Sequence, residues 1–218
     1  MPKRLKNLGR PAVLVIDMQR DFVDEGAPIE CPGARAIVRH ILDLTAKARR
    51  SDVPVIYTQE AHRAAKVDFG LELDYEEPEH CLEGSSGVEL LPALRPQHGD
   101  HLIVKRRYSA FFATDLDLLL RGLGVDTLVL TGVATDVCVR ATAQDAQQLN
   151  YRVVVVPECV AGTSVEQHQA ALRNIEYVFG YVEPLCAVMG LLDAFGGERE
   201  AEEEPLHLAF AEYAAAPS

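Results

Sequence analysis

The sequence contains no tryptophan, and aromatic residues make up only 6% of its 218 residues. It also lacks any apolar run that approaches the ~20 residues needed to span a bilayer. Basic residues occur near the N-terminus, but no long apolar segment follows them as it would in a signal peptide. These absences predict a soluble, cytoplasmic protein with no membrane partner.

Positive charge is scarce as well. Lys and Arg number 21 against 33 Asp and Glu, which gives a formal net charge of −12. Because affinity for nucleic acids depends on Lys and Arg neutralising phosphates, this balance disfavours a nucleic-acid partner. Acidic residues are concentrated near the C-terminus. We predict one domain over residues 1–197 and an acidic, solvated extension over residues 198–218.

The five cysteines are widely spaced and form no Cys-x-x-Cys pair. This spacing fits neither a disulfide framework nor a structural zinc site. The cysteines are therefore expected to be core residues or to include one reactive thiol. They lie at positions 31, 81, 138, 159 and 186.

Short apolar runs rich in β-branched residues alternate with segments of helical period, a pattern typical of a parallel sheet covered by helices on both faces. The sequence therefore predicts a doubly wound α/β domain. About forty residues, Gln59 to Asp100, separate the second and third strands, and so long a connection is usually functional. We expect it to cover the active site and to contain a short helix near Ser86–Leu94. The predicted strands are 12–16, 53–58, 101–104, 127–131 and 152–156, and the predicted helices are 34–50, 115–122, 136–149 and 165–178.

Three reactive residues follow predicted strands. Asp17 follows VLVI, Lys105 follows HLIV, and Cys138 lies in GVATDVC. Each alone has a common structural explanation: a capping aspartate, a solvated lysine or an inert buried cysteine. Ligands of open α/β sheets bind beyond the carboxyl ends of the strands, so the coincidence of all three favours a shared site.

The three residue types suit an activated thiol. A helix N-terminus and the Lys105 ammonium would lower the pKa of Cys138, and Asp17 can accept the thiol proton and later return it to a leaving amine. The turn from Gly132 onward can aim the backbone N–H groups of Ala134 and Cys138 at one point, as an oxyanion hole requires. Acyl transfer is the chemistry that this arrangement predicts.

The sequence resembles the isochorismatase-like cysteine hydrolases over roughly residues 11–195. The resemblance depends on VLVIDMQRDF at 13–22, VKRRYSAFFATDLDLLL at 104–120 and TGVATDVCVRATAQDA at 131–146. It implies a six-stranded parallel sheet in a three-layer αβα sandwich, a triad of Asp17, Lys105 and Cys138, and a cis peptide at Val133–Ala134. In this family the cysteine is typical of amide hydrolases, so the resemblance implies C–N hydrolysis through a thioester.

Residues 99–120 and 171–186 look most similar to biuret, triuret and ureidoacrylate hydrolases, which implies a small ureido or N-carbamoyl substrate. N-carbamoylsarcosine amidohydrolase and nicotinamidase are alternatives, as is a catalytically silent binding or assembly domain. Arg107 either clamps a substrate carboxylate or pairs with the acidic surface. The family commonly forms dimers or tetramers, so a homo-oligomer is expected, with the C-terminal extension as a candidate contact. The candidate substrate-binding residues are Phe22, Arg107, Tyr108, Phe111 and Val133.

Nicotinamidases typically hold a metal through an Asp-x-His pair and a further His, often with a Trp between the pair. Here Glu60 and His62 could ligate a metal, but no clear third ligand follows, and we do not associate His80 with the metal. The chain also has no Trp. We therefore expect no metal and no cofactor, with a small-molecule amide as the binding partner.

Overall fold

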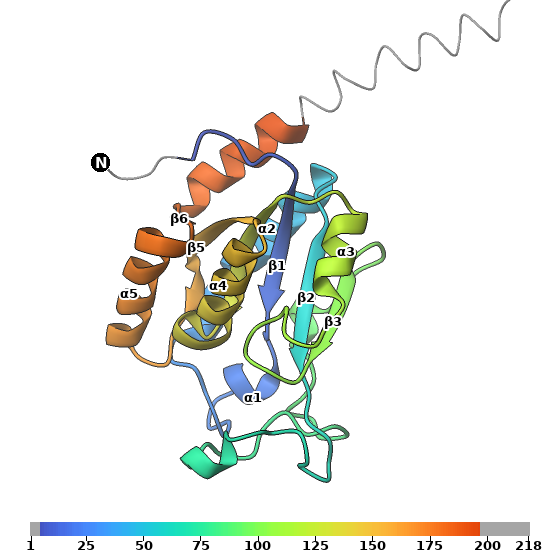
Figure 1. Cartoon of the computed structure of the whole chain (residues 1–218), viewed down its shortest axis with the longest axis vertical. Coiled ribbons are helices and arrows are strands. Elements are labelled where there is room, and N and C mark those ends of the chain that lie inside the picture. The colour runs from blue at the N-terminus through green and yellow to red at the C-terminus, as the bar shows by residue number, and fades with distance from the viewer. Residues whose placement is uncertain (1–4, 197–218) are drawn as a thin grey trace, which may run out of the picture.

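The structure is a computed structural model that describes residues 5–196 (Figure 1). The predicted acidic extension and its candidate contact with a neighbouring copy lie outside the described residues. Within residues 5–196, none of the helices has the length and apolar character that crossing a membrane requires.

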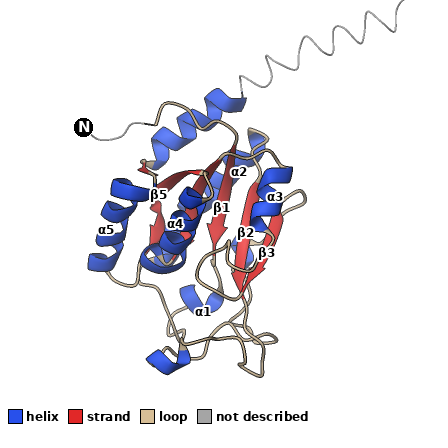
Figure 2. Cartoon of the chain, viewed as in Figure 1, coloured by secondary structure: helices blue, strands red, loops and turns tan. Residues whose placement is uncertain are grey.

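A sheet of six parallel strands forms the centre of the domain, in the order β3-β2-β1-β4-β5-β6 (Figure 2). The five predicted strands are all present, and β2 and β5 extend beyond their predicted ends. Sequence analysis missed β6, which has only two residues. The strands are β1 Pro11–Ile16, β2 Val55–Glu60, β3 His101–Lys105, β4 Thr127–Val133, β5 Arg152–Ala161 and β6 Tyr181–Val182.

Helices cover both faces of the sheet, which confirms the three-layer sandwich. Side chains alternate across β1: Val13 and Val15 pack in one apolar cluster with α2 and the helix at residues 185–196, whereas Leu14 and Ile16 pack in a second cluster with α3 and α4. All four of these β1 side chains are fully buried. Besides the helix at residues 185–196, the described α-helices are α1 Arg20–Val23, α2 Ala34–Arg50, α3 Leu116–Gly122, α4 Arg140–Gln148 and α5 Val165–Asn174.

Two predicted helices are divided in the structure. The segment predicted at 136–149 begins with a wide π-type turn, Thr135–Val139, before α4, and the segment at 165–178 ends in a second such turn, Ile175–Phe179, after α5. A π-type turn inside a helix is often found at a functional site. The first of these turns contains Cys138.

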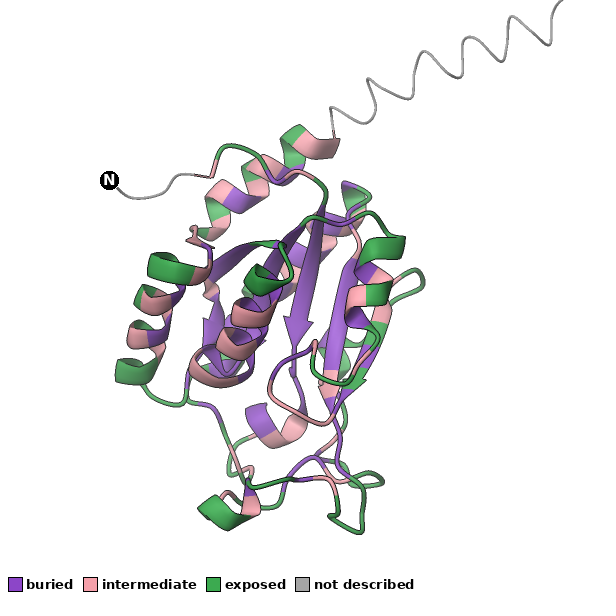
Figure 3. Cartoon of the chain, in the orientation of Figure 1, coloured by how far each residue is buried: buried purple, intermediate pink, exposed green. Residues whose placement is uncertain are grey.

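The long connection between β2 and β3 packs at the carboxyl end of the sheet. It contains two short 3-10 turns, Leu73–Tyr75 and Pro92–Leu94, and the second lies within the region where a helix was expected. Bridges from Gln19 to Leu90 and from His62 to Leu82 tie the connection down. Most residues of the connection are exposed to solvent, but some of them are buried against the rest of the domain (Figure 3). It therefore covers the end of the sheet where the predicted reactive residues lie.

Gly132 allows β4 to approach β1 closely at this end. It pairs with Ile16 and has a φ of +97°, and a Cβ atom at this position would collide with the backbone of Ile16. Ile16 directly precedes Asp17, and Gly132 lies six residues before Cys138. The absence of a side chain at Gly132 therefore lets the strand ends that hold two reactive residues come together.

We predict that Gly132→Ala lowers the free energy of unfolding by roughly 2 kcal/mol more than Gly99→Ala, because only the first adds overpacking. Gly99 is a matched control: its φ is +91°, but a Cβ there would meet nothing within 4 Å. Both variants share the penalty of a left-handed alanine, about 1–2 kcal/mol. Urea denaturation measures the difference, and equal losses in the two variants would contradict the close approach.

Candidate active site

The structure brings Asp17, Lys105 and Cys138 together at the carboxyl end of the sheet. Asp17 directly follows β1, Lys105 ends β3, and Cys138 lies in the turn after β4. The Lys105 Nζ atom is 2.8 Å from Asp17 Oδ2 and 3.6 Å from Cys138 Sγ. All three side chains are buried. The ammonium thus bridges the carboxylate and the thiol, as the strand-end positions predicted.

Asp17 is held in an unusual backbone conformation by Thr58 of β2. Its φ is +50°, in the left-handed region that non-glycine residues rarely adopt. The Asp17 N–H donates to Thr58 Oγ1 at 3.1 Å, and the Thr58 hydroxyl donates to Asp17 Oδ1 at 2.6 Å. With Oδ1 held by Thr58, Oδ2 is the oxygen that meets Lys105. Sequence analysis missed Thr58 because its role depends on the pairing of β1 with β2.

Glu60, the last residue of β2, completes the charged cluster. Its Oε2 atom is 2.5 Å from Lys105 Nζ and 3.8 Å from Cys138 Sγ. Gln19 fixes the Glu60 backbone, because its side-chain amide donates to Glu60 O at 2.7 Å and accepts from Glu60 N at 2.8 Å. Sequence analysis considered Glu60 only as a metal ligand. Its position at a strand end is the signal that could have placed it beside Lys105.

The cluster keeps Lys105 charged. Burial alone would lower the pKa of Lys105, but the nearby Asp17, Cys138 and Glu60 raise it well above its ordinary value. Burial alone would raise the pKa of Glu60, but the Lys105 charge and hydrogen bonds from the surrounding residues lower it well below its usual range. The pKa of Asp17 is raised, chiefly by burial, although Lys105 opposes the shift. Both pKa shifts favour the charged forms, so Lys105 and Glu60 form a buried ion pair.

The expectation that the pKa of Cys138 lies below that of a free thiol is wrong. Burial raises the pKa of Cys138 well above that of a free thiol, and the carboxylates of Asp17 and Glu60 add to the shift. Lys105 lowers the pKa, as expected, but one ammonium does not outweigh burial and two acids. Cys138 is therefore a thiol at rest, and a base must remove its proton when it reacts.

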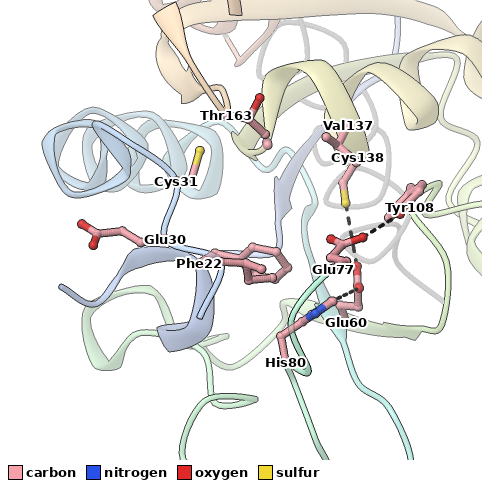
Figure 4. Close-up of a pocket in the computed structure, with 12 residues that line it drawn as sticks. Phe22, Glu30, Cys31, Glu60, Glu77, His80, Tyr108, Val137, Cys138 and Thr163 are labelled. Atoms are coloured by element: carbon pink, nitrogen blue, oxygen red, sulfur yellow. Dashed lines mark hydrogen bonds and ion pairs between the residues drawn. The ribbon is translucent and has the colours of Figure 1, made fainter. Parts of the chain in front are cut away.

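A cavity of about 230 Å³ opens in front of Cys138 (Figure 4). Among the predicted residues, Phe22, Tyr108 and Ala134 line it. The lining residues that sequence analysis did not assign to the pocket come mainly from loops, whose contacts have no periodic signature. They are Ile29, Glu30, Cys31, Glu60, Glu77, His80, Val137 and Thr163.

Three predicted substrate-binding residues do not line this cavity. Val133 is fully buried in the core, because it is the last residue of a central strand. Phe111 stacks on Tyr151 with ring centroids 5.8 Å apart. Arg107 lies against Gly70, and its guanidinium donates to the carbonyl oxygens of Asp68 and Arg106. Arg107 thus braces the long connection, and its guanidinium is directed at backbone carbonyls and not into the cavity.

The remaining cysteines differ in their surroundings. Cys31, Cys81 and Cys159 are buried, and burial raises the pKa of Cys31 and of Cys159 to about 12. Cys186 is exposed, so the expectation that it fills the core is wrong. Cys31 lines the cavity with Cys138, but it lacks a neighbouring Lys–Asp pair.

Glu60 also belongs to a second group, with His62, Glu72 and His80, whose ligand-type atoms all lie within 4.8 Å of one another. The Nε2 atoms of His62 and His80 are 3.2 Å and 3.1 Å from Glu60 Oε1. The structure thus supplies the further ligands that sequence analysis did not find after His62. His80 is far from Glu60 and His62 in sequence, but the fold of the long connection brings it next to them.

The four side chains fit a divalent cation. His80 Nδ1 donates to Pro78 O at 2.7 Å, which directs Nε2 into the cluster, and such a carbonyl partner commonly supports a histidine ligand. Glu72 Oε2 is buried without a hydrogen-bond partner. Burial and the Glu60 charge raise the pKa of Glu72 to about 7. Imidazole nitrogens and carboxylate oxygens are ligands that zinc accepts.

A family model described as "Isochorismatase domain" matches residues 11–185. The chain belongs to the isochorismatase family. Maleamate amidohydrolase of Pseudomonas putida is 36% identical to it over 79% of this chain and 82% of the relative. Ureidoacrylate amidohydrolase RutB of Methylobacterium radiotolerans is 33% identical over 80% and 76%, and N-carbamoylsarcosine amidase of an Arthrobacter species is 32% identical over 88% and 75%. Hydrolysis of amide C–N bonds is the chemistry of these isochorismatase-family relatives.

Solved structures of the family agree with the fold. An isochorismatase-like hydrolase from Alkaliphilus metalliredigens aligns with a TM-score of 0.77 and 38% identity over 83% of this chain and 98% of that one. A cysteine hydrolase from Pseudomonas syringae pv. phaseolicola has a TM-score of 0.81 at 28% identity, over 89% and 97%. A pyrazinamidase of Pyrococcus horikoshii in complex with zinc has a TM-score of 0.73 at 27% identity, over 80% and 99%.

We predict that Thr58→Val moves the acid limb of the kcat/KM profile to higher pH. The Thr58 hydrogen bond lowers the pKa of Asp17, so its loss raises that pKa, and the carboxylate form is then lost at a higher pH as pH falls. We also expect kcat to fall about tenfold, since a hydrogen bond to a charged group is worth about 1.5–3 kcal/mol.

The matched control is Thr131→Val, which removes a buried hydroxyl that donates to Leu14 O, away from Asp17. The pH profile of the control should keep its acid limb, and a measurement of ammonia release across pH 4–9 compares the two. An unmoved limb in Thr58→Val would show that Thr58 does not tune Asp17.

Proposed function

We propose that the chain is a cysteine-dependent amidohydrolase that cleaves a C–N bond of a small ureido or N-carbamoyl compound, similar to biuret or triuret, through a thioester. The observation that carries this proposal is the position of Lys105 Nζ, 2.8 Å from Asp17 Oδ2 and 3.6 Å from the Sγ atom of Cys138, which lines the cavity. One ammonium thereby holds a base beside a nucleophile.

In the first step, Asp17 accepts the Cys138 proton as Sγ forms a bond to the substrate carbonyl carbon. The carbonyl oxygen becomes an oxyanion, which the backbone N–H groups of Ala134 and Cys138 stabilise. Cys138 lies at the start of the helical segment formed by the turn Thr135–Val139 and α4, so the helix dipole favours this negative charge. Because the resting thiol is neutral, proton transfer accompanies the attack.

In the second step, the tetrahedral intermediate collapses. Its C–N bond breaks, and Asp17 returns the proton to the departing nitrogen, which leaves as ammonia or a small amine. A water molecule then loses a proton to Asp17 as it attacks the thioester carbonyl, the C–S bond breaks, and Asp17 returns that proton to Sγ. Lys105 remains charged throughout the reaction and holds the Asp17 carboxylate in position beside the Cys138 thiol.

A divalent ion bound by Glu60, His62, Glu72 and His80 would supply positive charge to the cavity wall beside Lys105. The residues of the chain have their own roles in either case. Glu60 pairs with Lys105, and Phe22 and Tyr108 wall the cavity in which the thioester forms.

The alternative substrates differ in charge. Maleamate and ureidoacrylate, after which two relatives are named, contain carboxylates, and so does N-carbamoylsarcosine. Arg107, the side chain expected to clamp such a group, is directed at backbone carbonyls outside the cavity. This placement favours an uncharged ureido compound over ureidoacrylate or N-carbamoylsarcosine. From the resemblance, the proposal also includes a cytoplasmic homo-oligomer, a dimer or tetramer.

We predict that Cys138→Ala lowers ammonia release at least about a thousandfold on every substrate that the wild type cleaves, since removal of a nucleophile leaves only residual catalysis. The substrate panel is biuret, triuret, ureidoacrylate, N-carbamoylsarcosine and nicotinamide. Cys186→Ala, which removes an exposed thiol elsewhere, is the control and should keep wild-type activity. Full activity of Cys138→Ala would reject both the thiol mechanism and the proposed function.

A further inference from the structure

Glu77 places a carboxylate at the cavity that contains Cys138. It lies in the long connection between β2 and β3, where its backbone N–H donates to Glu72 O at 3.2 Å and Pro78 follows it. The Tyr108 hydroxyl donates to Glu77 Oε2 at 3.1 Å. Figure 4 shows the Glu77 and Tyr108 side chains pointing toward one another on the side of the cavity where Cys138 lies. Hydrogen bonds therefore hold both the backbone and the side chain of Glu77 in place.

One oxygen of Glu77 is available to a ligand. Burial and the charges of Glu72 and Glu77 raise the pKa of Tyr108, so its phenol stays protonated and remains the donor to Oε2. No described residue donates to the other oxygen, Oε1. The Glu77 side chain is half-buried, and its carboxylate is thus partly shielded from water while it faces the cavity.

The cations near the cavity are already engaged. Lys105 pairs with Asp17 and Glu60, and the Arg106 guanidinium pairs with Asp68 and Glu83. Arg107 is directed at backbone carbonyls. Among the described residues that line the cavity, none is Lys or Arg. Among the described residues, Glu77 therefore has no Lys or Arg partner, and both ring nitrogens of the lining His80 are engaged by Pro78 O and Glu60 Oε1. An entering carboxylate would meet Glu77 without a neutralising charge.

The walls around Glu77 are aromatic. Phe22, His80 and Tyr108 all line the cavity, and the Phe22 and His80 rings meet edge to face with centroids 6.0 Å apart. Aromatic faces attract cations through their quadrupole, and carboxylates accept from N–H donors. Glu30 also lines the cavity, but it is exposed and points away from Cys138 in Figure 4. Glu60 lines the cavity too, but its carboxylate is paired with Lys105. Among the lining carboxylates, Glu77 is therefore the one that faces Cys138 without a Lys or Arg partner.

We propose that Glu77, held by Tyr108, is the specificity-determining residue of the cavity and selects amides whose remote group is a cation or an N–H donor over those that carry a carboxylate. This inference rests on the proposed function, because it describes the end of the substrate that lies away from the carbonyl attacked by Cys138. The order of preference is cationic, then neutral, then anionic.

A divalent ion in the neighbouring cluster leaves this order unchanged. With the charge of Asp17 set against that of Lys105, the two carboxylates of the cluster, Glu60 and Glu72, match the charge of the ion. Glu77 is not one of the four residues in that group. The charge of Glu77 toward the cavity therefore stays unmatched with or without the ion.

Charged thiol reagents test the selection without a need for turnover. The cationic 2-aminoethyl methanethiosulfonate and the anionic 2-sulfonatoethyl methanethiosulfonate are applied to the full chain at pH 8, and peptide mass spectrometry gives the rate at each cysteine. The exposed Cys186 is the internal reference. We expect the Cys138-to-Cys186 rate ratio to be about tenfold higher for the cationic reagent, as one partly shielded charge implies.

The variants assign this preference to Glu77. In Glu77→Gln the tenfold difference should fall to within about threefold. In Glu76→Gln, an exposed neighbour of the same charge that does not line the cavity, the difference should persist. Tyr108→Phe, which removes only the hydroxyl that holds Glu77, should reduce the difference partially. Equal or faster modification by the anionic reagent, or equal effects of Glu77→Gln and Glu76→Gln, would overturn the proposal.

Three matched ureas test the same order in catalysis. (4-Aminobutyl)urea, butylurea and 4-ureidobutanoate share a ureido head and differ in the charge of the far end. In the wild type, kcat/KM should be highest for (4-aminobutyl)urea, intermediate for butylurea and lowest for 4-ureidobutanoate. In Glu77→Gln the differences in kcat/KM between the three substrates should become smaller. If none of the three is cleaved, the proposed function is contradicted while the reagent order still decides the charge selection. If the carboxylate is the best substrate, the charge selection is wrong and the amidohydrolase stands.

Discussion

The buried ammonium of Lys105 is the constraint on which the rest of the site depends. An isolated charge in a protein interior is strongly unfavourable, so Lys105 can be buried only with partners of opposite charge. Asp17 Oδ2 at 2.8 Å and Glu60 Oε2 at 2.5 Å provide them. Because these partners come from the ends of β1 and β2, the sheet must bring three strand ends to one point. The fold and the chemistry are therefore coupled through one charge.

The same cluster sets the protonation states that the mechanism needs. Burial, together with the carboxylates of Asp17 and Glu60, raises the pKa of Cys138 against the opposing effect of Lys105 and favours the thiol at rest. Asp17 is strained, buried and held by Thr58, and such a base is poised to exchange one proton with the thiol. A neutral resting thiol has a further consequence: during catalysis the Cys138 proton must move to Asp17 as the bond from Sγ to the substrate carbon forms.

Sequence patterns predicted the fold and the central trio well, because both follow from periodicity along the chain. A buried parallel strand is a continuous apolar run, and a reactive residue directly after such a run lies at the carboxyl end of the sheet. Five of the six strands and the positions of Asp17, Lys105 and Cys138 could be derived in this way. The sixth strand has two residues and no detectable pattern.

The walls of the cavity could not be predicted, because they depend on how the long connection folds back. Glu77 and His80 come from this connection, and Thr58 acts across a strand pair. Arg107 follows a catalytic candidate in sequence, yet its side chain turns toward Asp68 of the same connection. Proximity in sequence to Lys105 thus predicted the lining position of Tyr108 but not the positions of Arg107 and Phe111, which lie outside the cavity lining. Tertiary contacts determine where the side chains beyond the strand ends lie, and such contacts leave no pattern in the local sequence.

The central claim is that Cys138 forms a thioester with the substrate beside Lys105 and Asp17. Rapid quenching in acid during turnover, followed by peptide mass spectrometry, tests it most directly. The account predicts a transient adduct on the Cys138 peptide whose added mass equals the acyl part of the substrate, and which disappears as the substrate is exhausted. Product formation at full rate with an unmodified Cys138 peptide, at quench times shorter than one turnover, would contradict it.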